Sequence, residues 1–195
     1  VGTDTLTSIE GIRGTDFADT YNAAGFTSDA APTPSANAGS ASNFNEFEGM
    51  GGNDTITGNG NTRVSYDNAT AAVTVTLGAG GSGTSTGDAS VGSDTFVSGV
   101  TRVRGSDFGD TIAGNGGNNF LEGQGGADTL TGGTGADRFV YAATTDGTDH
   151  IIDFSGHDGQ GDLLAFDHRA FGNGLAVGGA DTGTLDPSHF VANAT

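Results

Sequence analysis

The chain contains no cysteine, no tryptophan and no lysine, and only three of its 195 residues are proline. The lack of cysteine excludes a disulfide framework and thiol chemistry. No run of about 18 apolar residues occurs, so we expect no membrane-spanning helix and no membrane insertion. With so little proline and no three-residue period, a collagen-like structure is excluded as well.

Positive charge is scarce. Six arginines stand against 24 aspartates and glutamates, which gives a formal net charge of −18. Such a surface repels nucleic acid and anionic lipid and attracts cations, so we expect no nucleic-acid partner. The arginines are dispersed along the sequence, which predicts no anion-binding patch.

Glycine, by contrast, is abundant. It supplies 37 of the 195 residues, more than twice its ordinary share, while hydrophobic residues make up only 33%. Glycine loses much backbone entropy on folding, so a chain of this composition stays disordered unless a repeated element compensates. The repeats are therefore the feature to examine first.

A nine-residue unit recurs along residues 103–139. Each unit combines one apolar residue, a glycine-rich turn and one acid or amide. The apolar positions are Val103, Ile112, Leu121, Leu130 and Phe139, and the acid positions are Asp110, Asn119, Asp128 and Asp137. An isolated copy at residues 47–56 carries Asp54 in the acid position.

A longer repeat overlies the short one. VGTDTLTS at residues 1–8 matches VGSDTFVS at residues 91–98, and RGTDFADT, which contains Asp19, matches RGSDFGDT at residues 104–111. We expect residues 1–138 to form one repeat region, built of an incomplete and a complete module of about 90 residues and interrupted by a loop over about 23–42. Residues 139–195 are expected to be a capping segment of the same solenoid. The chain begins within a module, as a piece of a longer protein would.

The spacing of the acids has a chemical consequence. Nine residues have room for a short strand and a tight turn, so two units make one coil with strands on two faces. Asp128 then lies above Asp110, and Asp137 above Asn119. Carboxylates about 4.8 Å apart repel by about 1 kcal/mol per pair in water and by more where water is excluded. Calcium takes about six to eight oxygen ligands and would neutralise the ladder, whereas zinc prefers Cys and His and magnesium needs a tighter octahedron. Several Ca²⁺ ions between coils are therefore predicted.

The nonapeptides resemble GGxGxDxUx, the calcium-binding repeat of RTX proteins. TGGTGADRF at residues 131–139 matches in full, EGQGGADTL has Gln124 at the second glycine, GNGGNN has Asn119 for the aspartate, and RGSDFGD has Ser106 and Phe108 at glycine positions. The resemblance implies an all-β fold, a right-handed parallel β-roll or β-solenoid with calcium bound in the glycine-rich turns between coils. It also implies secretion to the extracellular space or cell surface, commonly by type I export, and folding on external calcium.

The segment GTDHIIDF resembles the acid-bearing strand that often follows the last RTX repeats, which adds Asp149 and Asp153 as candidate ligands. The expected metal-site residues are Asp19, Asp54, Asp110, Asn119, Asp128, Asp137, Asp149 and Asp153, with the turn residues Gly114, Gly116, Gly123, Gly125, Gly132 and Thr134. Asp4, Asp16, Asp94 and Asp107 are expected to be turn residues instead. The alternative is a metal-free solenoid in which Asp and Asn only stabilise turns.

Two short motifs of enzymes also occur. GTSTG at residues 83–87 fits GxSxG around Ser85, and GAGGSG at residues 78–83 fits GxGxxG, but no helical pattern follows either of them. Both are interpreted as accidental, so we expect no catalytic residues and no enzyme.

The favoured function is a calcium-binding structural region of a larger secreted protein, such as a stalk, an adhesin or a matrix element. Its partners would be calcium, a cell-surface or matrix component, or further copies of itself. The alternatives are the export and folding module of a secreted protease, hydrolase or epimerase, and a self-assembling filament or surface-layer subunit.

Overall fold

The computed structural model describes residues 11–24, 44–155 and 161–167. The repeat at residues 1–8, most of the expected loop and the end of the expected cap lie outside these ranges. The described residues are all-β. The elements are β1 (Gly11–Arg13), β2 (Thr20–Asn22), β3 (Asn45–Glu48), β4 (Thr55–Ser65), β5 (Thr74–Leu77), the short 3₁₀ turn η1 (Ala79–Gly81), β6 (Gly83–Thr86), β7 (Ser93–Arg104), β8 (Thr111–Ala113), β9 (Phe120–Glu122), β10 (Thr129–Thr131), β11 (Arg138–Tyr141), β12 (His150–Ile151) and β13 (Leu163–Phe166).

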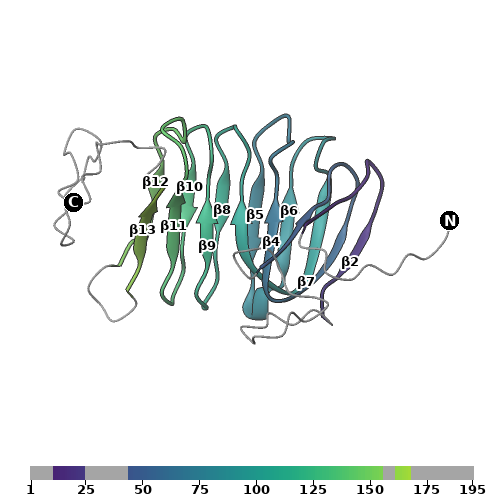
Figure 1. Ribbon diagram of the computed structural model, residues 1–195, viewed down its shortest axis with the longest axis horizontal. Coiled ribbons are helices and arrows are strands. Elements are labelled where there is room, and N and C mark those ends of the chain that lie inside the picture. The colour runs from purple at the N-terminus through teal and green to yellow at the C-terminus, as the bar shows by residue number, and fades with distance from the viewer. Residues whose placement is uncertain (1–10, 25–43, 156–160, 168–195) are drawn as a thin grey trace.

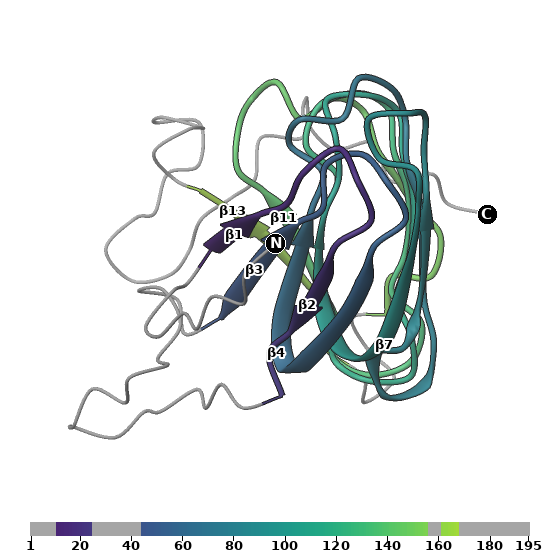
Figure 2. The same cartoon turned by 90° about the vertical axis from the view of Figure 1, so that its right-hand side faces the viewer.

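The strands form two faces that are joined by β4 and β7, since each of these long strands runs through both. The first face contains β1, β3, the second half of β4, the second half of β7, β9, β11 and β13. The second face contains β2, the first halves of β4 and β7, and then β6, β5, β8, β10 and β12. The strands stand side by side along the molecule in Figure 1, and the coils overlie one another in Figure 2.

The register confirms that two nonapeptides make one coil. On the first face Val103 pairs with Leu121, and Leu121 pairs with Phe139. On the second face Ile112 pairs with Leu130. Every one of these parallel pairs joins residues eighteen positions apart. The turns of successive coils are therefore stacked, and so are the acids that they carry.

The core lies between the two faces and is built from one side chain per nonapeptide. Ile112, Leu121 and Phe139 are completely buried, and Val103 and Leu130 are 1% exposed. Successive residues of a strand point to opposite sides, so the neighbours of each core residue face outward. Each fully buried side chain of this size stabilises the fold by about 1.5–3 kcal/mol, which offsets the entropy lost by the glycine-rich turns.

A hairpin interrupts the parallel stack. The alternating VTVTL sequence predicts a strand, and β5 is found there. It pairs antiparallel with β6, and β6 pairs antiparallel with β7. Ser85 lies within β6, is completely buried and donates a hydrogen bond from Oγ to Asp94 Oδ2 at 2.7 Å. It is therefore part of an extended strand and not of the strand-to-helix turn that GxSxG requires.

The arginines, although dispersed along the sequence, gather on one face of the described structure. The five arginines of the described ranges all lie on strands of the first face: Arg13, Arg63, Arg102, Arg104 and Arg138. Residues far apart in sequence become neighbours because the parallel strands are stacked in register. No helix within the described ranges is long and apolar enough to cross a membrane.

Candidate metal-binding turns

The acids form three ladders along the edges of the stack. In each rung, a carboxylate Oδ1 accepts a hydrogen bond from the backbone N–H of the acid or amide residue in the preceding coil. Asp128 accepts from Asp110 at 2.7 Å, and Asp137 accepts from Asn119 at 2.8 Å. The ladders are Asp19–Asp54–Asp94, Asp110–Asp128–Asp149 and Asn119–Asp137–Asp162. The predicted stacking of Asp128 on Asp110 and of Asp137 on Asn119 is thus found.

The first member of each ladder lies in a turn that is closed by its own side chains. In residues 105–110, Ser106 donates from its backbone N–H to Asp110 Oδ2 at 2.6 Å and from Oγ to Asp110 Oδ1 at 2.7 Å. Phe108 N–H in turn donates to Ser106 Oγ at 3.2 Å. We call such a turn a closed turn.

The other two closed turns repeat this pattern. Thr15 donates from both its backbone N–H and its hydroxyl to Asp19 Oδ2. Asn115 donates its backbone N–H to Asn119 Oδ1 at 2.8 Å. The side chains of Thr15 and Asn115 also accept the N–H of the residue two positions later. In each of the three closed turns the side chain of the acid or amide is thus held by hydrogen bonds from its own turn.

The middle member of each ladder lies in a different kind of turn, which we call an open turn. The open turns begin at Gly49, Gly123 and Gly132. The second residue of each has a left-handed backbone conformation, with φ of 63° at Met50, 69° at Gln124 and 95° at Gly133. The acid four residues later keeps one oxygen without a partner. These orphaned atoms are Oδ2 of Asp54, Oδ2 of Asp128 and Oδ2 of Asp137, and all three side chains are buried.

The open turns carry backbone strain and need close stacking. A left-handed conformation costs a non-glycine residue about 1–2 kcal/mol, which Met50 and Gln124 must bear. At the fourth position Gly126 has φ of 113°, and a Cβ there would lie 2.5 Å from the carbonyl carbon of Phe108 in the stacked closed turn. Strain of this kind persists where the surrounding structure enforces it, and it is common at ligand sites.

Glycine at the first position of each turn leaves the space that a carboxylate or amide oxygen of the same turn occupies. A Cβ on Gly123 would overlap Asp128 Oδ2, and a Cβ on Gly132 would overlap Asp137 Oδ2. Main-chain oxygens of the neighbouring coil approach the same space in the closed turns, since a Cβ on Gly105 would lie 2.6 Å from the carbonyl oxygen of Gly123. Carboxylate and carbonyl oxygens therefore converge at the turns, which is the donor set that calcium takes.

The other turn residues predicted from the sequence serve the stacking of the turns. A Cβ on Gly114 would lie close to the carbonyl oxygen of Gly132, and one on Gly116 would lie 3.3 Å from Thr134 Oγ1. Thr134 donates its backbone N–H to the carbonyl oxygen of Asn115 at 3.1 Å. A Cβ on Gly125 would lie 3.4 Å from Asp107. Their structural role here is contact between coils.

The electrostatics of the open turns disfavour a negative charge. Burial raises the pKa of Asp128 to about 7, and repulsion from the other two acids of its ladder adds to this. Burial likewise raises the pKa of Asp54 to about 6, with repulsion from Asp94 and Asp19 as a further cause. The pKa of Asp137 is raised as well, first by burial. A cation beside each Oδ2 would remove the cost of keeping these groups ionised.

These shifts predict how the stability of the metal-free chain depends on pH. An acid whose pKa is raised by folding binds more protons in the folded state, so its contribution to stability is present at low pH and is lost as pH rises through the folded-state value. We expect the metal-free thermal midpoint to fall between about pH 4 and pH 8, because Asp54 and Asp128 have pKa values of about 6 and about 7. Thermal unfolding in EDTA across this range tests it, and a midpoint that rises steadily with pH would contradict it.

The two C-terminal acids predicted from the sequence both accept hydrogen bonds from open turns. Asp149 Oδ1 accepts the backbone N–H of Asp128 at 3.1 Å. The two carboxylate oxygens of Asp153 accept the N–H groups of Gly132 and Gly133, both at 2.8 Å. Both predicted residues therefore contact the two open turns nearest the C-terminus.

Two ladder residues were missed by sequence reasoning. Asp94 was interpreted as a turn residue, but it lies in β7 and its Oδ1 accepts the N–H of Asp54 at 3.0 Å. Asp162 was not considered, and its Oδ1 accepts the N–H of Asp137 at 2.9 Å. Asp162 directly precedes a strand, as Asp110, Asp128 and most other ladder acids do. An acid just before an apolar segment was the signal that could have identified it.

The donor set also limits which metal could bind. Within residues 11–24, 44–155 and 161–167, no group of three or more His, Cys, Asp or Glu side chains is placed to hold a metal ion. An ion at an open turn would rely on few carboxylates and several carbonyl oxygens. Such an oxygen set suits calcium and not zinc.

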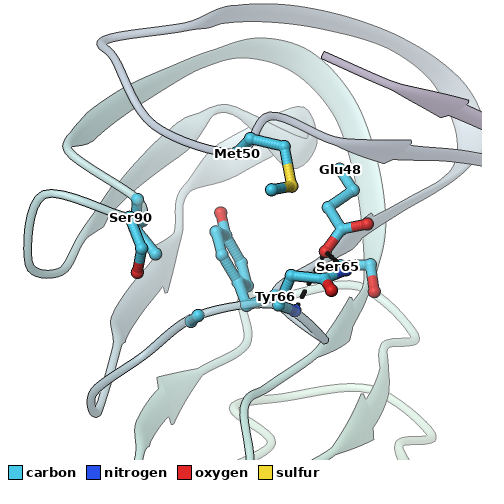
Figure 3. A pocket seen from close by; sticks show the side chains of 8 residues that line it. Glu48, Met50, Ser65, Tyr66 and Ser90 are labelled. Atoms are coloured by element: carbon cyan, nitrogen blue, oxygen red, sulfur yellow. Dashed lines mark hydrogen bonds between the residues drawn. The ribbon is translucent and has the colours of Figure 1, made fainter. Parts of the chain in front are cut away.

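A small cavity beside one open turn is not a second ligand site. It is lined by Met50, Ser65 and Tyr66 among others, and Figure 3 shows Met50 and Tyr66 pointing toward each other. Its volume is ≈ 10 Å³, about the space of one water molecule. Ser65 Oγ is buried there without a partner, which a water could satisfy.

Comparison with known families agrees with the geometry of the turns. Residues 42–62 and 104–139 match the family model of the RTX calcium-binding nonapeptide repeat in four copies. The matched stretches contain all three open turns. The closed turn of Asp19 lies outside the match, as do Asp149, Asp153 and Asp162. No curated protein matched the chain.

Proposed function

We propose that this chain is a calcium-binding structural region, a right-handed parallel β-roll that becomes rigid when its open turns are loaded. The described residues would hold three ions, one each beside Oδ2 of Asp54, Asp128 and Asp137. The observation that carries the proposal is that each of these buried oxygens lacks a hydrogen-bond partner. Buried polar atoms are almost always satisfied, so an orphaned carboxylate oxygen at the same point of three ladders points to a missing cation.

The closed turns would have a different role. Asp19, Asp110 and Asn119 were expected to be ligands through their side chains, but these side chains already accept hydrogen bonds inside their own turns. We propose that the closed turns form without metal and present main-chain oxygens to the open turn stacked on them. Asp149, Asp153 and Asp162 would support the open turns from the other side.

Calcium would act on folding through charge and through the linkage of coils. Without the ion, each open turn keeps a buried carboxylate between two other polar groups of its ladder. The bound ion supplies positive charge, while the chain's carboxylate and carbonyl oxygens hold it between coils. A site of this kind is absent from the unfolded chain, so the free energy of binding contributes to folding.

The cellular role is proposed from the repeat class. RTX repeat proteins are typically secreted by type I export, so we propose an extracellular or cell-surface location, where calcium is available. A region that consists of stacked coils suits a stalk, an adhesin or a matrix element, with a surface component or further copies as partners. Residues 1–138 would form the roll and residues 139–195 its cap.

A second candidate is the export and folding module of a secreted enzyme whose catalytic domain lies elsewhere in the same protein. A self-assembling filament or surface-layer subunit is a third. The two enzyme-like motifs give no support to catalysis within the described residues, since Ser85 is completely buried in a strand. Sequence adjoining this region separates the first two candidates: further modules favour the stalk, and a catalytic motif favours the enzyme.

The proposal predicts that stacked acids differ in their effect on calcium binding. Asp128→Asn should lower calcium affinity by about tenfold or more, because the site loses its only orphaned carboxylate oxygen and its charge. The same change should raise the thermal midpoint of the metal-free chain, since it removes a carboxyl group whose pKa burial raises to about 7. Calcium titrations followed by circular dichroism, with and without EDTA, measure both effects.

Two matched variants control for changes of stability. Asp110→Asn alters the neighbour in the same ladder, and Asn119→Ala alters a closed turn on the other edge. Asn119→Ala should lower the metal-free midpoint, because it removes internal hydrogen bonds worth about 1 kcal/mol each, and both variants should change calcium affinity much less than Asp128→Asn does. Equal losses of affinity in the three variants would contradict the division into open and closed turns.

A further inference from the structure

The side chain of Gln124 joins its own turn to two others. Gln124 is the second residue of the open turn 123–128, where the repeat motif has glycine. Its Nε2 donates one hydrogen bond to the carbonyl oxygen of Gly105 at 2.7 Å and another to Asp67 Oδ1 at 2.8 Å. Gly105 begins the closed turn on which this open turn is stacked, and Asp67 lies between β4 and β5. One side-chain amide therefore ties the open turn to two neighbouring turns.

The two stacked pairs of closed and open turns nearest the C-terminus are joined in different ways. In one pair, Thr134 of the open turn donates its backbone N–H to the carbonyl oxygen of Asn115 in the closed turn at 3.1 Å. In the other pair the corresponding bond, from Gly125 N–H to the carbonyl oxygen of Ser106, is absent from this described part of the chain. The Gln124 side chain supplies a hydrogen bond across the same junction instead.

The third open turn lacks such a tether, although its backbone is alike. Met50 occupies the position of Gln124 and has nearly the same left-handed conformation, with φ of 63° against 69°. Its side chain points toward Tyr66 (Figure 3), and a thioether has no hydrogen to donate. The left-handed conformation therefore does not itself bring the tether, which depends on the glutamine amide.

The tether lies beside the orphaned oxygen of its turn. A Cβ on Gly123, the residue directly before Gln124, would overlap Asp128 Oδ2. Farther along the turn Gly126 packs closely on the closed turn, since a Cβ there would lie 2.5 Å from the carbonyl carbon of Phe108. The open turn is thus held at two points, by a side chain and by close packing. A binding site that is ordered beforehand loses less entropy when its ligand binds.

We propose that Gln124 is a positioning residue of the calcium site at Asp128: it orders the open turn before the ion binds and does not itself contact the ion. Asp67, its second acceptor, is held in turn by Arg104, whose Nη1 lies 3.5 Å from Asp67 Oδ2. The inference rests on the proposed calcium function and adds a difference between its sites. The turn of Asp128 is ordered by a side chain, whereas the turn of Asp54 has no such tether.

Gln124→Asn separates this role from that of a strained substitute for glycine. Asparagine tolerates a left-handed backbone better than most residues, and its shorter side chain loses the reach to Gly105. If Gln124 only strained the turn, the change would tighten calcium binding. As a tether, its loss should raise the calcium midpoint of the turn about fivefold, the effect of one lost hydrogen bond. Calcium titrations of the full chain, followed through the NMR signals of the amides of residues 123–128, measure the midpoint.

Two variants of Asp67 form a matched pair. Asp67→Ala and Asp67→Asn remove the same negative charge, but asparagine keeps an oxygen that can accept the hydrogen bond from Gln124. Asp67→Ala should therefore raise the calcium midpoint of this turn about twofold more than Asp67→Asn does. The difference should disappear in the Gln124→Asn background, because the contact is already broken there. A difference that persists in that background would contradict a tether through Gln124.

Hydrogen exchange in saturating calcium distinguishes a local effect from a loss of global stability. The backbone N–H groups of Asp128 and Asp54 occupy equivalent rungs, where each donates to the next acid of its ladder. Gln124→Asn should speed exchange about fivefold at Asp128 and leave Asp54 unchanged. Equal acceleration at both would overturn the proposal.

The titrations also distinguish this inference from the calcium proposal on which it rests. If the wild-type signals of residues 123–128 do not respond to calcium, the calcium proposal fails and the inference fails with it. If they respond and Gln124→Asn has an equal or lower calcium midpoint, only the role of Gln124 is overturned.

Discussion

Calcium added to the metal-free chain is expected to raise its free energy of unfolding by about 8 kcal/mol when the free ion is at about 100 times the dissociation constant. Each of three open turns contributes about 2.7 kcal/mol at that concentration if the unfolded chain does not bind the ion. This is comparable with the whole stability of an ordinary domain, which is about 5–15 kcal/mol. We therefore expect much of the β-structure to form only in calcium.

Far-UV circular dichroism and thermal unfolding measure this effect directly. Millimolar calcium should increase the β signal and raise the midpoint, and a chelator should reverse both changes. Magnesium at the same concentration is the control, because it demands stricter octahedral geometry and releases its water reluctantly. A spectrum and midpoint that stay the same in excess EDTA would show that the orphaned oxygens need no ion.

Removal of residues 140–195 is expected to have the second largest effect. β12 and β13 pair with β10 and β11 and so extend the stack by one more coil. Ile151 and Leu164 pack against the core cluster, and the loss of two such side chains costs at least about 3 kcal/mol. The deletion also removes Asp149, Asp153 and Asp162, whose carboxylates hold the last two open turns.

In a stack of coils each unit is stabilised by its neighbours, so the loss at one end weakens the units next to it. The truncated chain should need more calcium to fold, and its transition should be less cooperative, although every nonapeptide remains. Calcium titrations of the full and truncated chains under identical conditions compare the two. Folding at the same calcium concentration with the same steepness would mean that the segment is not a cap.

The fold could be predicted because a single period controls it. Val103, Ile112, Leu121, Leu130 and Phe139 recur every nine residues, and the eighteen-residue register follows from the need to place successive strands on opposite faces. The same arithmetic placed Asp128 on Asp110. Where the period is broken the motif makes no prediction: Asp162 lies 25 residues after Asp137, so its place in the ladder could not be counted from the motif.

The difference between open and closed turns could not be predicted from the motif. Ser106 and Asn115 look like defects of a glycine-rich consensus, since they replace its glycines. In the structure their side chains form hydrogen bonds within the turn, so the turn closes without an ion. The outcome depends on the backbone angle at the second position of the turn, which is a property of the stacked chain and not of residue type alone, as Gln124 shows.

The gathering of arginines on the first face was missed for a related reason. Arg63 and Arg102 are 39 residues apart, and Arg102 and Arg138 are 36 apart, so no local pattern in the sequence joins them. Only the register of β4, β7, β9 and β11 makes them neighbours. Parallel stacking thus creates surfaces that a search for clustered charge along the chain cannot find.

The position of bound calcium tests the central claim most directly. Anomalous scattering from crystals grown in calcium locates each ion independently of the protein atoms. We expect peaks within coordination distance, about 2.3–2.6 Å, of Oδ2 of Asp54, Asp128 and Asp137, and none on the side chains of Asp19, Asp110 and Asn119. Calcium-grown crystals in which those three Oδ2 atoms have no ion, or in which ions bind the closed-turn side chains instead, would contradict the account.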